Sequence, residues 1–517
     1  MAAASFVEGT AALAAALAAA AVLVLRDPRS RALAMPVALI LALGAVAVIA
    51  GSSISDDISG RMGLVGAAGV VGLVLLVVLT VAFVRRPGWF VLAVVLTLPF
   101  RIPVPTGADD TANLLLPLYG VLAAGVLAHL WRVFRTDEEW PREDPRARRV
   151  FVALAIVVVL YALQSLYSPD LEHAVKTLGF FYVPFAVAMV LLVELRWSRQ
   201  LVLQVLAVTV GLALLFAAVG FVEWATGRLL ISNEKVLAAN DLKPYFRVNS
   251  LFFDPNVYGR FLAIVMVTLA GVLLWAPARR DVARVAVGLA LLWAALVLTL
   301  SESSFAALLV GLAVLAALRW RSLPVLAVCG AGILIGVVLL VAAPGQLGLQ
   351  TSSFSDVDTA SSGRAKLIRG GLGMAADRPI TGYGSGSFSE RYRKREHLLS
   401  SSRTSAESHT IPVTVAAEQG VIGLAAYAWL LWSSFELVFG GLRGTLRRRP
   451  AGVVLVARCV VAAAFCALLL HTLVYAAFLE DPLTWTLLAM AAALRRVDPE
   501  AEARVSRSDS AAQAVPT

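Results

Sequence analysis

The chain has 517 residues, of which 59% are hydrophobic and only 15% are charged, and its mean hydropathy is +0.82. The apolar fraction is well above the roughly 45–50% found in soluble domains, which excludes a soluble globular protein. A formal net charge of +10 would suggest nucleic-acid binding in a soluble protein, but most Lys and Arg residues here lie in short segments between apolar runs. There they set membrane orientation, so no nucleic-acid partner is expected.

Apolar runs of about 20 residues, the length of a helix that crosses the roughly 30 Å hydrocarbon core of a bilayer, recur from end to end. The predicted apolar segments are 8–25, 32–50, 63–84, 88–100, 113–131, 150–167, 177–193, 201–223, 257–275, 283–300, 303–318, 323–343, 411–438, 453–476 and 482–494. Segments 88–100 and 482–494 are short, and we expect them to be re-entrant or tilted. The predicted fold class is all-α, a polytopic transmembrane helical bundle of about 12–15 spans with one large, partly helical extracytoplasmic loop.

Six regions follow from this pattern. They are N-terminal transmembrane helices (1–223), an outer loop (224–256), further transmembrane helices (257–343), a large Arg-rich extracytoplasmic loop (344–410), C-terminal transmembrane helices (411–496) and a cytoplasmic tail (497–517). The tail has too little apolar content to fold, and we expect it to be disordered.

Connections rich in cations alternate with acidic or neutral ones. The cationic connections are 26–31, 85–86, 132–149, 196–199, 279–280, 319–321 and 443–449. The positive-inside rule places these on the cytoplasmic side, which puts the N-terminus outside and the C-terminus inside. The heavy use of Ala, Val, Leu and Arg suggests a GC-rich bacterial genome. The expected location is therefore the bacterial cytoplasmic (inner) membrane, spanned many times, with both long loops outside.

The loop 344–410 is unusually cationic for an outer loop. Its nine cations, set against six acidic residues, are Arg364, Lys366, Arg369, Arg378, Arg391, Arg393, Lys394, Arg395 and Arg403. Long loops translocate whatever their charge, so one interpretation is a solvated surface loop. The other is that the cations bind phosphate. A short amphipathic helix is predicted from Arg364, and a Gly-rich turn at 382–386 ends it.

A histidine stands where this loop enters the next apolar segment. His409 could act as a base or hydrogen-bond donor at a hydroxyl group, because its unperturbed pKa is near 6.5. A surface histidine at the membrane interface is the alternative interpretation. Glu418 and Gly420 follow it within the apolar segment.

The outer loop 224–256 ends in an Asp254-Pro255-Asn256 turn that leads into a span. Asp or Asn at this position accepts hydrogen bonds from free helix N–H groups, and capping alone could explain the motif. Arg247 and Arg260 flank the turn, however, and Arg260 lies about one turn inside the apolar segment. A charge at that depth is costly unless it is paired or faces a cavity, and the same holds for Glu302.

These motifs together, and in order, resemble the O-antigen ligase and polymerase family. The resemblance covers roughly 245–430. It rests on the Phe-Phe-Asp-Pro-Asn turn ending at Asn256, the Ser-Glu-Ser-Ser start of a span at 301–304, the Arg364 stretch, the segment 377–384, and His409 with Gly420.

The resemblance implies a metal-independent glycosyltransferase of the GT-C type that needs no cofactor. It would take a glycan from an undecaprenyl-pyrophosphate donor and join it to a hydroxyl of a saccharide, lipid or protein acceptor at the outer membrane face. Arg247 and Arg364 would bind the pyrophosphate, supported by Arg260, Lys366 and Arg369, and His409 would be catalytic. Asp254, Asn256, Glu302, Glu418 and Gly420 would support the site, the surrounding lipids would hold the donor tail, and a flippase is a possible partner.

Other functions fit the same outline. A transporter or flippase of lipid-linked saccharide would also need charged residues in a membrane bundle, but the sequence contains no internal repeat and its charge is concentrated at one outer face. A different wall polymerase and a non-catalytic assembly scaffold remain further alternatives. Turnover of substrate without an ion gradient would separate an enzyme from a transporter.

Overall fold

Long runs of Ala, Val and Leu give this chain its helices, because these side chains favour burial or contact with lipid. The computed structural model describes residues 2–50, 62–105, 111–136, 143–231, 237, 240, 246–275, 279–320, 322, 324, 325, 327, 364–397, 410–448, 452–475 and 477–497. His409 and most of the predicted segment 323–343 lie outside the described residues, as does the tail after residue 497.

The first half of the described chain contains most of the predicted spans. Its helices are α1 (Ala2–Val24), α2 (Pro28–Ala50), α4 (Met62–Arg85), α5 (Gly88–Thr97), α6 (Leu116–Arg135), α7 (Pro145–Ser165), α8 (Leu171–Thr177), the π-helical turn η1 (Leu178–Tyr182), α9 (Val183–Glu194) and α10 (Arg199–Thr226). Between α5 and α6 lie two short antiparallel strands, β1 (Ile102–Pro105) and β2 (Thr111–Leu114), paired from Ile102 with Leu114 to Pro105 with Thr111. The bundle is otherwise helical in the residues that the structure describes.

The second half adds the helices that surround the candidate site. They are α12 (Pro255–Trp275), α13 (Arg279–Thr299), α14 (Glu302–Arg319), α17 (Arg364–Asp377), α18 (Phe388–Arg395), α19 (Ile411–Phe439), α20 (Leu442–Arg448), α21 (Val453–Val474) and α22 (Pro482–Leu494). The helix predicted to begin at Arg364 is confirmed as α17. As predicted, α5 and α22 are too short to cross a bilayer fully.

The protein is a polytopic helical bundle. Within the described residues, eleven helices are long and apolar enough to cross a membrane. Many large apolar side chains point outward, among them Leu309, Val71 and Trp432 with exposed fractions of 68%, 67% and 69%. Such a surface is unfavourable in water and favourable in hydrocarbon.

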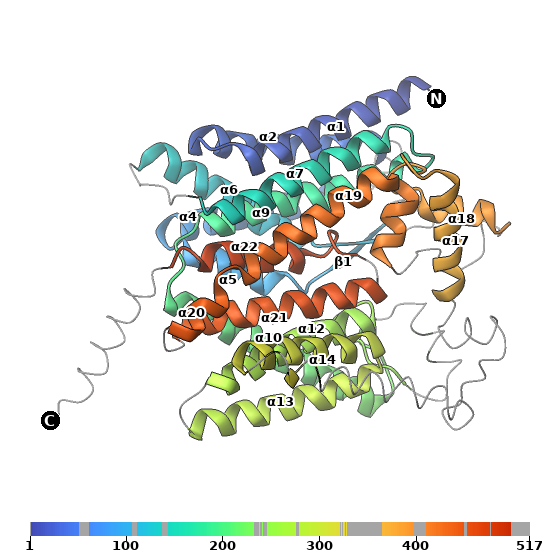
Figure 1. Ribbon diagram of the computed structural model, residues 1–517. Coiled ribbons are helices and arrows are strands. Elements are labelled where there is room, and N and C mark those ends of the chain that lie inside the picture. The colour runs from blue at the N-terminus through green and yellow to red at the C-terminus, as the bar shows by residue number, and fades with distance from the viewer. Residues whose placement is uncertain are drawn as a thin grey trace, which may run out of the picture.

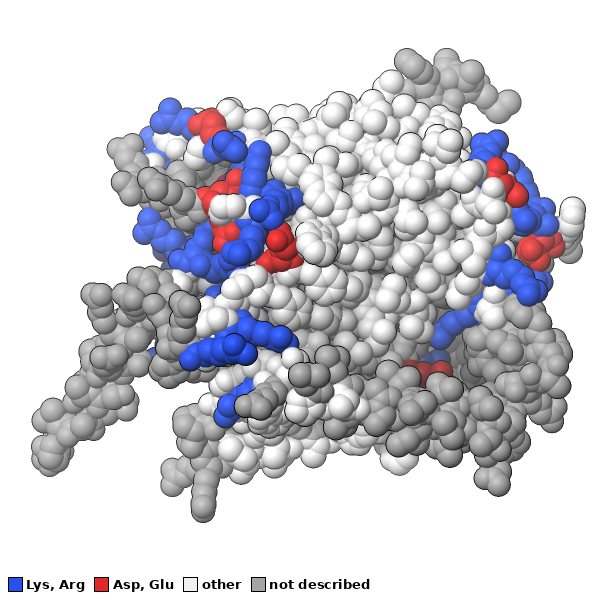
Figure 2. Space-filling model, viewed as in Figure 1, with Lys and Arg blue, Asp and Glu red and all other residues white. Residues whose placement is uncertain are grey.

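Charged side chains gather at the two ends of the bundle and leave a broad uncharged band between them (Figure 2). One end carries α17 and α18, and the start of α1 lies at this end as well, while α20 lies at the opposite end (Figure 1). Near the opposite end, Arg31 pairs with Glu194 at 2.9 Å, and His129 lies 3.0 Å from the same carboxylate. The His129 contact therefore joins α6 to α9.

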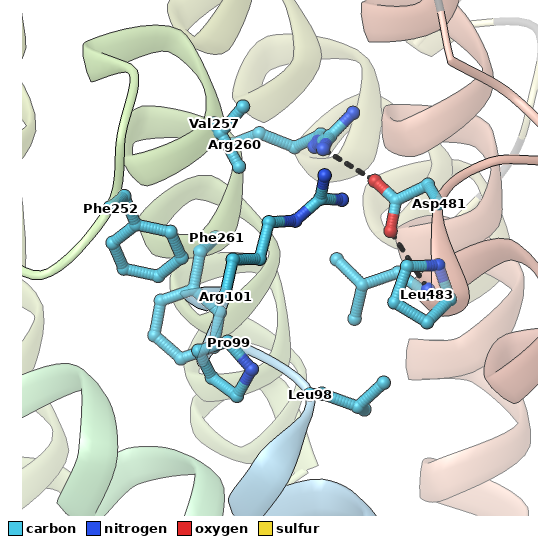
Figure 3. Close-up of a pocket in the computed structure, with 10 residues that line it drawn as sticks. Leu98, Pro99, Arg101, Phe252, Val257, Arg260, Phe261, Asp481 and Leu483 are labelled. Atoms are coloured by element: carbon cyan, nitrogen blue, oxygen red, sulfur yellow. Dashed lines mark hydrogen bonds and ion pairs between the residues drawn. The ribbon is translucent and has the colours of Figure 1, made fainter. Parts of the chain in front are cut away.

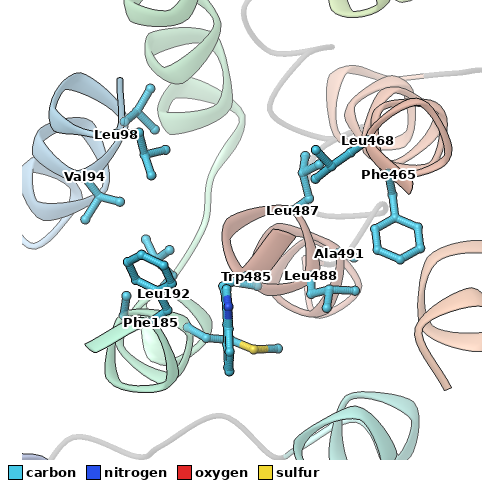
Figure 4. Packing of buried hydrophobic residues seen from close by; sticks show 14 of the residues in the cluster. Val94, Leu98, Phe185, Leu192, Phe465, Leu468, Trp485, Leu487, Leu488 and Ala491 are labelled. Atoms are coloured by element: carbon cyan, nitrogen blue, oxygen red, sulfur yellow. The ribbon is translucent and has the colours of Figure 1, made fainter. Parts of the chain in front are cut away.

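The short helix α22 packs at the centre of the bundle, against α9, α19 and α21. Trp485 on α22 is 1% exposed, lies with its ring 6.5 Å from that of Phe185, and donates from its indole N–H to the Leu479 carbonyl at 2.8 Å (Figure 4). This packing fixes the start of α22, which carries Asp481, next to α12.

Candidate functional site

The site begins at the first turn of α12, where the Asp-Pro-Asn motif forms the predicted cap. Asp254 Oδ1 accepts the backbone N–H of Asn256 at 2.6 Å. The Asn256 side chain is thereby held at the start of the helix, and its Oδ1 atom accepts two hydrogen bonds, one from Arg247 and one from Ser301.

Arg247 is fixed by contacts with three separate segments. Its Nε donates to the Thr299 carbonyl at 2.9 Å and its Nη2 donates to Asn256 Oδ1 at 3.2 Å. The side chain of Asn240 also forms two hydrogen bonds of 3.1 Å with the Arg247 backbone. A guanidinium has five N–H donors, and these contacts use two, so an oriented cation remains with donors for an anionic ligand.

A chain of hydrogen bonds leads from Asn256 to a buried histidine. Ser301 Oγ donates to Asn256 Oδ1 at 2.9 Å and lies 3.3 Å from Ser303 Oγ, which in turn lies 3.2 Å from His471 Nε2. Leu300, directly before this serine cluster, has a φ of 49°, which is uncommon for a branched residue and costs backbone energy. This series of hydrogen bonds therefore joins the starts of α12 and α14 to α21.

Arg260, one turn further along α12, is 3% exposed and forms an ion pair with Asp481, which is 2% exposed. Arg260 Nη2 lies 2.5 Å from Asp481 Oδ2, while Asp481 Oδ1 accepts the N–H of Leu483 and caps α22. The sequence-based expectation that Arg260 must be paired or face a cavity is confirmed on both counts, because it also lines a pocket (Figure 3).

Arg101, between α5 and β1, lines the same pocket, and its guanidinium points toward Arg260 and Asp481 (Figure 3). Burial is the largest influence on Arg101 and lowers its pKa; the charge of Asp481 opposes this effect and that of Arg260 adds to it. Two guanidinium groups thus face one buried carboxylate.

The three cations predicted on α17 have different surroundings. Arg364, at its first residue, is half-buried and close enough to His471 to interact with it electrostatically, as Arg260 does. Lys366 Nζ lies 3.5 Å from Glu396 Oε2 and is half-exposed, and Arg369 is exposed. The structure therefore brings Arg364 toward His471 and turns Lys366 toward Glu396, just after α18.

Glu418 and Gly420 hold the Gly-rich segment 382–386 in place. The two carboxylate oxygens of Glu418 accept the N–H groups of Gly386 and Phe388 at 2.8 and 2.9 Å. Gly420 interrupts α19 with a φ of 63°, and a Cβ atom there would lie 2.3 Å from the Ile380 carbonyl oxygen. Both residues thus fix the loop that follows α17.

Two further predicted residues stand apart from this cluster. Glu302 is exposed in the first turn of α14, although its serine neighbours are buried. His409 lies outside the described residues, one position before the described Thr410 that precedes α19.

Sequence reasoning missed Arg101, His471 and Asp481. Arg101 and Asp481 each stand at the end of a short apolar segment, and His471 lies within a span, where an ionisable residue is by itself a signal of function. What the sequence could not supply was the pairing, since Asp481 lies more than two hundred residues from its partner Arg260.

Residues 287–428 match the model of the O-antigen ligase family. No curated protein matches the chain. The matched region includes α14, α17 and the kink of α19, so the resemblance of these segments to the O-antigen ligases is confirmed. It supports a membrane protein that ligates or polymerises glycans, with glycosyltransferase-like activity on lipid-linked substrates.

Proposed function

We propose that this protein transfers a glycan from an undecaprenyl-pyrophosphate donor to an acceptor hydroxyl at the outer face of the cytoplasmic membrane, as a ligase or polymerase of cell-surface polysaccharide. The observation that carries the proposal is the arrangement of three arginines around one hydrogen-bonded chain: Arg247 donates to Asn256 Oδ1 at its α12 end, and Arg260 and Arg364 lie close enough to His471 at its α21 end to interact with it electrostatically. Their position at the end of a membrane bundle suits a donor whose charged head lies at the interface while its tail stays in hydrocarbon.

The chemistry requires a fixed positive field. In the transfer, the acceptor oxygen attacks the anomeric carbon of the glycan, and the bond from that carbon to the pyrophosphate oxygen breaks. Negative charge develops on the departing undecaprenyl pyrophosphate, and preorganised cations stabilise it most effectively where water is excluded. Arg247, oriented through Thr299 and Asn256, and Arg364, at the start of α17, provide this stabilisation, with Arg260 as support.

His409 takes the proton of the acceptor hydroxyl in this proposal. Thr410, its neighbour in sequence, precedes the first turn of α19, and that helix packs against α17, which begins with Arg364. The reaction then needs no metal ion, because the arginines neutralise the leaving group and the histidine accepts the proton. The large loop faces the outside of the cell and the C-terminus faces the cytoplasm.

The test is an assay of the purified full-length protein with an undecaprenyl-pyrophosphate-linked oligosaccharide and an acceptor. Release of undecaprenyl pyrophosphate and the length of the product are followed for the intact chain, for His409→Ala and for the control His397→Asn. His397 is exposed and has a φ of 51°, which Asn tolerates. We expect His409→Ala to lower release by about 100-fold or more and the control to change it little.

The form of the product distinguishes the two transferase activities. A ladder of products indicates a polymerase, and a single addition indicates a ligase. Absence of release, together with movement of lipid-linked saccharide across proteoliposomes, would instead establish a transporter and overturn the proposal.

A further inference from the structure

Two arginines next to the Gly-rich segment 382–386 lie over one tyrosine ring. The guanidinium carbon of Arg378 lies 4.7 Å from the centre of the Tyr383 ring, and that of Arg391 lies 5.2 Å from it. Arg378 directly follows α17, whereas Arg391 belongs to α18, and both helices lie at one end of the bundle (Figure 1). Two positive charges from different elements therefore meet at this ring.

Neither arginine forms an ion pair with a residue that the structure describes, although other cations of α18 do. Lys394 pairs with Glu390, and Arg395 pairs with Asp377. The Nε atom of Arg391 is in addition buried without a hydrogen-bond partner. Because like charges repel each other, an anion placed near both guanidinium groups would lower their electrostatic energy.

The same place adjoins the lipid-facing surface of α19. The Pro379 carbonyl accepts the Val421 N–H at 2.8 Å, which holds Ile380 beside the kink of this helix. Ile380 and Val421 have exposed fractions of 64% and 57%. Trp432, 69% exposed, lies about three helical turns beyond Val421 and therefore on the same face. Ile380 thus extends an outward apolar face of the bundle at its α17 end.

Tyrosines with polar tips mark this level as a membrane interface. Tyr167, just after α7, is 45% exposed and donates from its hydroxyl to the Thr381 carbonyl at 2.7 Å. Tyr383, half-buried, follows two residues later. Tyrosine is enriched where membrane meets water, because its ring is apolar and its hydroxyl is polar. The exposed Arg378, two residues before Ile380, therefore lies at the level of lipid phosphate groups.

We infer that Arg378, Arg391 and Tyr383 bind the head group of an anionic phospholipid in the leaflet at the α17 end of the bundle. The planar set of N–H donors on a guanidinium suits phosphate oxygens, and Ile380 contacts the acyl chains. A soluble anionic glycan fits less well, because the exposed apolar surface beside the arginines would then face water.

This lipid site is distinct from the place proposed for the donor. Arg364 is the first residue of α17 and Arg378 directly follows the last, so the two arginines stand at opposite ends of the helix. The inference therefore does not depend on the proposed function. A bound lipid would also hold the end of α17, the helix that begins with Arg364.

Photo-cross-linking tests the site in the full-length protein. The protein is reconstituted in vesicles that contain phosphatidylglycerol and phosphatidylcholine in equal amounts, and one of the two lipids carries a photoreactive head group. The cross-linked residues are then mapped. We expect phosphatidylglycerol to label the segment 378–391 about tenfold more than phosphatidylcholine does, because only the former carries a net negative charge. Equal labelling by the two lipids, or no labelling of this segment, would overturn the inference.

Paired substitutions measure the contribution of the two charges. Arg378→Gln combined with Arg391→Gln should lower labelling by phosphatidylglycerol about tenfold, because both charge-assisted contacts are lost. Arg378→Lys combined with Arg391→Lys keeps the charge and should retain most of the labelling. The control is Lys394→Gln combined with Arg395→Gln, which removes the same charge from cations that already have carboxylate partners and should leave labelling unchanged. An equal fall in the control would show that only net charge matters and would contradict a specific site.

Competition identifies the source of the anion. Undecaprenyl monophosphate, inorganic phosphate and an oligosaccharide of uronic acids are added separately at the concentration of phosphatidylglycerol, and none should reduce the labelling. Displacement by inorganic phosphate or by the oligosaccharide would assign the site to a soluble anion, and displacement by undecaprenyl monophosphate would assign it to the donor. Either result overturns the inference. None of these measurements requires glycan transfer, so absence of transfer by the intact chain affects the proposed function alone.

Discussion

Arg247 donates to Asn256 Oδ1 at 3.2 Å, although the two residues lie on opposite sides of the turn that starts α12. The same oxygen accepts a hydrogen bond from the Ser301 hydroxyl at 2.9 Å. The Asn256 amide therefore orients Arg247 and also holds Ser301, the residue directly before α14. Asn256 thus controls the direction of the Arg247 guanidinium without needing to touch the ligand.

Replacing Asn256 should therefore affect catalysis more than folding. We expect Asn256→Ala to lower the rate of glycan transfer about tenfold, because Arg247 loses one of its two side-chain hydrogen bonds and its orientation toward the leaving phosphate. Asn256→Asp keeps an oxygen acceptor for both hydrogen bonds but offsets the charge of Arg247, and it should mainly raise KM for the donor. The measurement is kcat and KM for each variant. Equal kinetics for Asn256→Ala and the intact chain would show that Arg247 needs no such support.

Asp481→Asn should destabilise the protein strongly. The change leaves the cap on the Leu483 N–H in place but removes the carboxylate charge that compensates Arg260. Loss of one partner of a buried ion pair typically lowers the free energy of unfolding by about 3–5 kcal/mol. Thermal unfolding in detergent measures the effect.

Two further variants check the cause of this loss. Asp27→Asn is the control, because Asp27 caps the exposed start of α2, and it should change the unfolding temperature little. Adding Arg260→Gln to Asp481→Asn should restore part of the stability by removing the unpaired charge. A double variant less stable than Asp481→Asn alone would contradict this account.

Gly420→Ala should disturb the docking of the segment that follows α17. The backbone of Gly420 has a φ of 63° and a ψ of −159°, and an added Cβ would lie 2.3 Å from the Ile380 carbonyl oxygen. We expect a loss of about 3 kcal/mol or more of unfolding free energy, because conformational strain and steric overlap add. Gly211→Ala is the matched control, since nothing lies within 4 Å of the added atom and Ala favours the helix. Similar unfolding temperatures for both variants would show that the kink tolerates a side chain.

The features that could be predicted from the sequence are those that depend on local spacing. The cap formed by Asp254 and the helix beginning at Arg364 both follow from residues a few positions apart, and the structure contains both. The need of Arg260 for a partner also followed from its depth in an apolar segment, but the identity of Asp481 did not, because only tertiary packing brings α22 beside α12.

The contacts of Glu418 could not be predicted from the sequence. The family resemblance placed it near the site, and in the structure it accepts the N–H groups of Gly386 and Phe388. A backbone hydrogen bond of this kind has no signature in residue type, because any loop N–H can donate it. The role of His409 stays a prediction, as do the contacts of Arg364 and Arg369 with a ligand.

His471 should act as a positioning residue. Its Nε2 atom lies 3.2 Å from Ser303 Oγ, and the hydrogen-bonded chain continues through Ser301 to Asn256 and Arg247. We expect His471→Leu to lower kcat about tenfold with little change in KM, because the loss of one buried hydrogen bond loosens the chain that orients Arg247. His471→Gln keeps a polar group for Ser303 and should retain more of the rate. If the unfolding temperature and kcat fall together in both variants, His471 contributes packing alone. If instead kcat falls in His471→Leu at an unchanged unfolding temperature and Gln rescues it, the chain from α21 to Arg247 is part of the catalytic site.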